Sequence, residues 1–136
     1  MALDQRDRGD ALDTWHHAQV HWDRLRRDVE EALEGLRQIA ERHRGTLSRR
    51  DHGTHVPVAI ELYPPPTKRP RNRAFPGGLL LVVVEECSLH VRVTARDFGR
   101  RKVEITDQTG RKLGSDLEFA IRLWMVQHVG VRPGSR

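Results

Sequence analysis

The residues LLLVVVEECSLHVRVTA, at positions 79–95, predict the centre of a β-sheet. Leu79–Val84 is the longest purely apolar run in the chain, and a run without alternation is typical of a central strand covered on both faces. Cys87–Ala95 then alternates between apolar and polar side chains, as a half-buried strand does. The acids Glu85 and Glu86 close the first strand. We therefore expect two neighbouring strands in the middle of a sheet.

Working outward from this stretch, two further strands are expected. Val56–Tyr63 alternates, with Val56, Val58, Ile60 and Leu62 on one face, and Pro57 favours an edge position because it has no N–H to donate. After a turn at residues 97–100, Arg101–Thr106 follows with Val103 and Ile105 pointing inward. The four strands predict a mainly antiparallel sheet.

A long amphipathic helix is expected at residues 11–43, where apolar side chains recur three and four residues apart, as in a coiled coil. About thirty helical residues span roughly 45 Å, whereas the rest of the chain forms a globule roughly 30–35 Å across. A straight helix would overhang, so the seam is expected to pair with a second copy. The alternative is a helix that breaks at Gly35 and folds back on its own sheet. The residues predicted for the dimer or partner interface are Trp15, Trp22, Leu25, Val29 and Leu36.

A second helix is expected near the C-terminus. Ser115 and Glu118 have the spacing of a capping box, with Ser115 as N-cap, and the helix runs to about His128. Apolar residues cover most of its circumference, which indicates burial on more than one side. The fold class is therefore α+β, with a long N-terminal helix, a four-stranded sheet and a C-terminal helix packed on it. We expect one domain at 11–130, a disordered segment at 1–10 and a loose tail at 131–136.

The loop PPPTKRPRNRAFPGG, at residues 64–78, joins the first two strands and holds five of the seven prolines. Proline keeps the backbone extended and outside the sheet ladder, so we expect an exposed, semi-stiff loop. Its length exceeds the usual connection in a compact domain, which favours a functional role. The loop carries Lys68, Arg69, Arg71 and Arg73.

The charge is divided unevenly. The net charge is +5, but residues 1–43 carry 7 basic and 10 acidic side chains, so the remainder of the chain has a net charge of +8. A basic face attracts polyanions by steering and counterion release. The alternative is a compositional bias of a GC-rich, bacterial-like genome, because 21 of the 24 basic residues are Arg.

Other chemistry finds little support in the sequence. His17 and His21 share a helix face with Asp13, and His52 and His55 form a second pair, but no CxxC or HExxH motif is present. Cys87 and His90 would point to opposite faces of a strand. We expect no enzymatic activity, no cofactor and no bound metal.

We therefore predict a small protein that binds DNA or RNA. It would contact phosphates through its basic loops and dimerise through its long helix. The alternative is a protein–protein adaptor or assembly subunit that docks a partner through the seam of helix 11–43. No apolar run approaches the roughly 20 residues of a membrane span, and we expect a soluble, cytoplasmic protein. The predicted nucleic-acid-binding residues are Lys68, Arg69, Arg71, Arg73, Arg100, Arg101, Lys102, Arg49 and Arg50.

Overall fold

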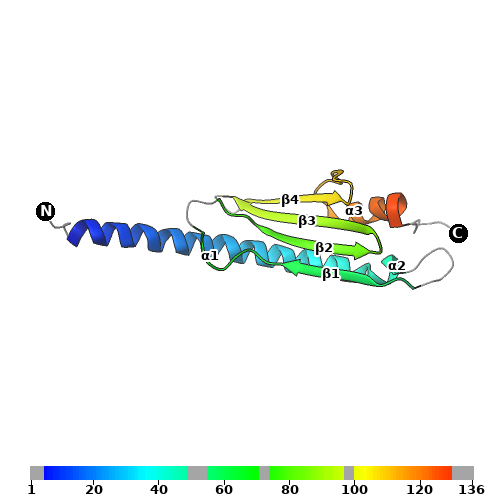
Figure 1. Ribbon diagram of the computed structural model, residues 1–136, viewed down its shortest axis with the longest axis horizontal. Helices are drawn as coiled ribbons and strands as arrows, with labels where there is room; N and C mark the ends of the chain where they lie inside the picture. Colours follow the sequence, from blue (N-terminus) through cyan, green and yellow to red (C-terminus); the bar gives the residue numbers. More distant parts are fainter. Residues whose placement is uncertain (1–4, 49–54, 71–73, 97–99, 130–136) are drawn as a thin grey trace.

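A four-stranded antiparallel sheet and two principal helices make up the computed structural model, which describes residues 5–48, 55–70, 74–96 and 100–129 (Figure 1). Side chains of the first helix are described from His17 onward. The elements, in chain order, are α1 (Gln5–Arg42), α2 (Arg44–Leu47), β1 (Val58–Tyr63), β2 (Gly78–Val84), β3 (Cys87–Arg96), β4 (Arg100–Asp107), α3 (Leu117–Trp124) and the π-helical turn η2 (Met125–Val129).

The sheet follows chain order, β1-β2-β3-β4, and each neighbouring pair is antiparallel. Leu81, in the middle of β2, lies between Glu61 of β1 and His90 of β3. The α+β prediction is confirmed: a long N-terminal helix, this sheet and a C-terminal helix in contact with β3 and β4.

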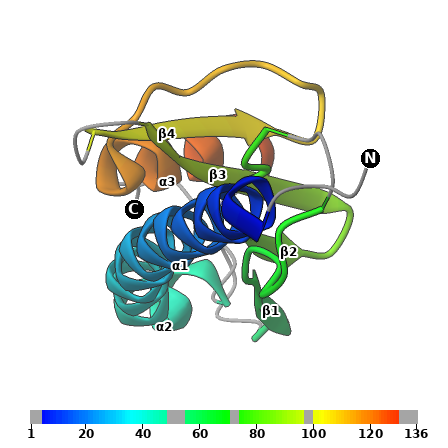
Figure 2. The ribbon, with the colours of Figure 1, turned by 90° about the vertical axis from the view of Figure 1, so that its left-hand side faces the viewer.

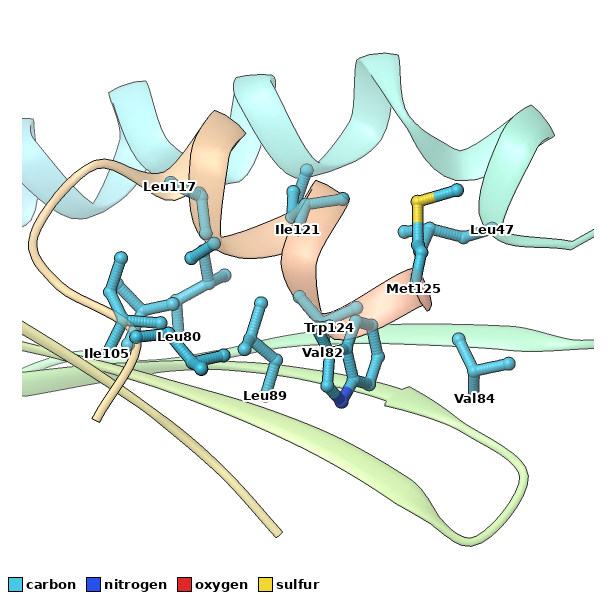
Figure 3. Packing of buried hydrophobic residues seen from close by; sticks show 14 of the residues in the cluster. Leu47, Leu80, Val82, Val84, Leu89, Ile105, Leu117, Ile121, Trp124 and Met125 are labelled. Atoms are coloured by element: carbon cyan, nitrogen blue, oxygen red, sulfur yellow. The ribbon is translucent and has the colours of Figure 1, made fainter. Parts of the chain in front are cut away.

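The core lies between the sheet and the helices, on the side of the sheet where α1 and α3 pack (Figure 2). Alternate residues of β2 and β3 point into it. Period-two alternation in the sequence therefore predicted β3, whereas β2 was predicted from its unbroken apolar run. α3 lies against both α1 and the sheet, so it is buried on more than one side, as predicted, but Phe119 on the same helix is 61% exposed (Figure 3). The core side chains that Figure 3 labels are Leu47, Leu80, Val82, Val84, Leu89, Ile105, Leu117, Ile121, Trp124 and Met125.

Helix α1 is continuous from Gln5, six residues before the predicted start, and it does not break at Gly35. A Cβ at Gly35 would meet nothing within 4 Å, so the glycine lies on an open helix face. The C-terminal half of α1 covers the sheet, whereas its N-terminal part extends well past the sheet's end (Figure 1). The predicted overhang is thus present, and the predicted alternative of a break at Gly35 is wrong.

Three local predictions need correction. The N-cap of α3 is Asp116, whose carboxylate accepts from the backbone N–H of Glu118 and Phe119, and not Ser115. Glu85 and Glu86 form a two-residue turn between β2 and β3 rather than a strand end, with Glu85 at φ 54°. The side chains of Leu79, Leu81 and Val83 point away from the helices and are only half-buried, so β2 is central without equal cover on both faces.

Candidate nucleic-acid interface

Two of the predicted basic segments, the loop after β1 and the start of β4, lie at the same end of the sheet. β1 ends at Tyr63 and β2 begins at Gly78, so the loop between them leaves and re-enters at that end. In the antiparallel register, Arg96 of β3 pairs with Arg100 of β4 at the same end. The two segments therefore lie at the same end of the sheet although about thirty positions separate them in the chain. We call the five described cations there the basic end: Lys68, Arg69, Arg100, Arg101 and Lys102.

The cations that β4 contributes to the basic end point to alternate faces of the sheet, because successive side chains of a strand do so. Arg101 points toward the helices, where its guanidinium lies 3.9 Å from the carboxylate of Glu31. Arg100 and Lys102 point to the other face, and all three side chains are exposed. Among the described residues, only Arg101 of the basic end has an ion-pair partner. The charge of the other four cations is therefore not neutralised within that part of the chain.

The described parts of the loop between β1 and β2, residues 64–70 and 74–77, are packed across α1, and we call them the strap. The indole N–H of Trp22 donates to the carbonyl oxygen of Pro66 at 3.0 Å. The Trp22 ring also meets the ring of Phe75 edge-on, with centroids 4.8 Å apart, a favoured aromatic geometry. Pro65 is buried. The strap is thus held by apolar and backbone contacts while Lys68 and Arg69 remain exposed.

A tight backbone approach fixes the return of the strap into β2. Gly77 has φ +74°, and a Cβ there would lie 2.3 Å from the carbonyl oxygen of Val93. Only glycine adopts this conformation at this distance without strain. A Cβ at the neighbouring Gly78 would lie 2.4 Å from the side chain of Leu33 in α1. Gly77 and Gly78 therefore allow the strap, the sheet and α1 to approach one another closely.

The predicted helix seam is used within the chain. Trp22 is 3% exposed beneath the strap, Leu25 and Val29 are buried, and Leu36 packs against the core. These four side chains are therefore covered by their own strap and sheet, which corrects their assignment as a free interface. The side chain of Trp15 lies outside the described part, and pairing of two copies stays a prediction.

Four of the predicted nucleic-acid-binding residues, Arg49, Arg50, Arg71 and Arg73, lie outside the described residues. The cluster Arg111–Lys112 follows β4, at the opposite end of the sheet from the strap. There the Lys112 ammonium lies 3.4 Å from the carboxylate of Glu104. The described basic clusters therefore do not form one continuous surface.

The opposite end holds a polar network that sequence reasoning missed. The Asp107 carboxylate is 2% exposed and accepts from the backbone N–H groups of Thr109 and Arg111 and from the Thr109 hydroxyl. Its second oxygen lies 2.9 Å from Nε2 of His128. The sequence showed this segment only as a polar turn. The sequence does contain a local sign of the network, because a hydroxyl residue follows Asp107 two positions later. The other partner, His128, is 21 positions away and has no such sign.

The network keeps the Asp107 carboxylate ionised. Burial alone would raise the pKa of Asp107, but the hydrogen bonds from Thr109, His128 and Arg111 outweigh burial and lower the pKa to about 2. Next to it, Gln108 accepts from the indole N–H of Trp124 at 3.2 Å. This end of the sheet is therefore held together by buried or shielded polar groups.

Cys87 and His90 have different partners in the structure, and the side chains of Asp13 and His52 lie outside the described part. The Cys87 thiol donates to the carbonyl oxygen of His128, whereas the His90 ring contacts the Ser88 hydroxyl. Across the ranges that the structure describes, no three His, Cys, Asp or Glu side chains gather as a metal site requires.

Comparison of the chain with protein-family models, curated proteins and solved structures gives no significant match. Within the described residues, no helix combines the length and the apolar character that crossing a membrane would require.

Proposed function

We propose that the protein binds nucleic acid by placing the cations of the basic end on phosphate groups. The observation that carries this proposal is that Lys68 and Arg69 of the strap and Arg100 and Lys102 of β4 lie at the same end of the sheet. All four are exposed, and the described part of the chain gives them no carboxylate partner. Positioned cations of this kind gain affinity for a polyanion by releasing its counterions.

The arrangement favours contacts to the backbone of the nucleic acid over reading of base edges. Phosphate contacts position a protein without carrying sequence information. Recognition of base edges commonly uses a helix or ribbon that fits a groove, with amide or guanidinium groups aimed at the bases. The basic end instead presents charges from a strap and a strand. We therefore expect weak sequence selectivity and strong dependence on salt.

The burial of the helix seam bears on the alternative function, docking of a partner protein through helix 11–43. Trp22, Leu25 and Val29 would have to leave their own core before a partner could bury them. Re-exposing large apolar side chains costs about 1.5–3 kcal/mol each, which a docking partner would have to offset. The seam therefore supports folding of this chain, and the basic end is the better candidate for an interface.

The test is fluorescence anisotropy with labelled single- and double-stranded DNA and RNA, at low and near-physiological salt. The key variant replaces Lys68, Arg69, Arg100 and Lys102 with Ala. We expect micromolar or tighter binding by the wild type at low salt. For duplex DNA, the salt slope of log K should shrink by about 0.9 for each phosphate that the variant no longer neutralises. An unchanged affinity in the quadruple variant would refute the assignment of the basic end.

A charge-matched control separates position from total charge. Lys68→Ala/Arg69→Ala and Arg111→Ala/Arg122→Ala both remove two exposed cations, but Arg111 and Arg122 lie away from the basic end. We expect the first pair to weaken binding clearly more than the second. Equal losses would mean that only net charge matters and that no interface exists at the strap.

A further inference from the structure

A cavity of about 250 Å³ lies between α1 and the strap, beside the basic end. Its apolar lining comes from Ala18, Trp22 and Leu25 of α1 and from Phe75 of the strap. Arg69, an exposed member of the basic end, also lines it, together with His21. The cavity therefore combines an aromatic and aliphatic wall with a cation at its margin.

This composition suits a planar aromatic group that is attached to an anion. Its volume lies just below the roughly 300–1,000 Å³ of pockets that hold drug-sized ligands, so it has room for one nucleobase and not for a base pair. Trp22 is 3% exposed and its indole N–H already donates to Pro66, so the stacking surface that the wall offers to a base is the half-buried ring of Phe75. Such contacts tolerate any base, because every base has a π-face.

We infer that this cavity takes one unstacked base of a single strand whose phosphates lie on the basic end. The inference rests on the proposed function and adds a preference for single strands to it. In a duplex, each base is paired and stacked, and moving one into the cavity would first require that its pairing and stacking be broken. A single strand avoids most of that cost. Arg69 belongs to both the cavity and the basic end, which joins the base site to the phosphate site.

The test compares a labelled oligothymidylate with a strand of the same length made of abasic residues and with a duplex. The abasic strand keeps every phosphate but has no base to insert. Because stacking of one base on a protein side chain contributes about 1–3 kcal/mol, we expect the wild type to bind oligothymidylate roughly fivefold to a hundredfold more tightly than the abasic strand. Ala18→Phe, which fills the cavity, should remove this difference and leave binding of the abasic strand unchanged.

Val20→Phe is the matched control, because Val20 lies on the same helix, is 46% exposed and does not line the cavity. It should preserve the preference for oligothymidylate over the abasic strand. Retained binding of the abasic strand by Ala18→Phe shows that the variant is folded. If the wild type binds both strands equally, the base site is refuted while the proposed function stands. If it binds neither strand, nor any other nucleic acid, both proposals are overturned.

Discussion

At one end of the sheet, β4 runs into Asp107, whose buried carboxylate is surrounded by donors. At the other end, β4 begins with Arg100 and Lys102, which are exposed and lack a carboxylate partner among the described residues. The same strand thus carries a polar group that is satisfied within the chain and charged groups that are not. The first kind of group stabilises a fold, whereas the second leaves charge available to a ligand.

The basic end holds its shape by means other than charge. The strap is fixed by the Trp22–Pro66 hydrogen bond, by the aromatic contact with Phe75 and by the close approach at Gly77. Its cations contribute nothing to these interactions. At the basic end, we therefore expect substitutions that disturb backbone packing to lower the free energy of unfolding strongly, and removal of charge to lower it little. At the Asp107 end, we expect the opposite.

The largest effect is expected for Gly77→Ala. Its Cβ would lie 2.3 Å from the carbonyl oxygen of Val93, at a φ of +74° that L-residues rarely adopt. The strain and the overlap together should cost about 3–4 kcal/mol of unfolding free energy. Gly110→Ala, in the turn at the Asp107 end, is the matched control, because φ is +86° but nothing lies within 4 Å of the new Cβ. We expect it to cost only about 1 kcal/mol. Urea denaturation measures both, and equal losses would mean that the strap does not pack tightly on β3.

Asp107→Ala should cost slightly less, about 2–3 kcal/mol. The substitution leaves the N–H groups of Thr109 and Arg111 without the carboxylate that accepts from them, and a shielded donor that loses its partner costs about 1–3 kcal/mol. It also frees His128, so η2 should loosen. Urea denaturation gives the loss, and hydrogen exchange of residues 107–111 reports its location. A loss below about 0.5 kcal/mol would show that the network is dispensable.

The difference between local and distant partners explains what the sequence could predict. The strands and helices could be predicted because the spacing or continuity of their apolar residues is visible over a few neighbouring positions. The contact between Trp22 and Pro66 spans 44 positions, and a helical seam has the same spacing whether it meets a second copy or its own strap. The role of Asp107 could not be predicted for the same reason, because its partner His128 follows α3 and lies 21 positions later in the chain. The placement of Lys68 and Arg100 at the same end of the sheet depends on the strand order, which composition does not contain.

Acid should weaken the wild type through the Asp107 end. The pKa of Asp107 is about 2 in the folded chain and 3.8 without the fold, so the carboxylate stabilises the folded state above about pH 4. This stability is lost as the pH falls through about 2, and it amounts to about 2 kcal/mol. In Asp107→Asn the contribution is absent at every pH. Denaturation from pH 6 to pH 2 should therefore show the gap between wild type and variant narrowing toward low pH, and a constant gap would contradict the assignment.

The smallest effect on the free energy of unfolding is expected for Lys68 and Arg69, two of the cations proposed to bind nucleic acid. Lys68→Ala/Arg69→Ala should change the unfolding free energy by no more than about 0.5 kcal/mol, because both side chains are exposed and neither has an ion-pair partner among the described residues. Removing two neighbouring cations also relieves their mutual repulsion, which offsets the reduced packing of their aliphatic stems. The same protein preparation should bind nucleic acid more weakly than the wild type. A loss of folding stability above about 1 kcal/mol would instead make these two cations part of the strap's structure, and the contrast between the two ends of the sheet would fail.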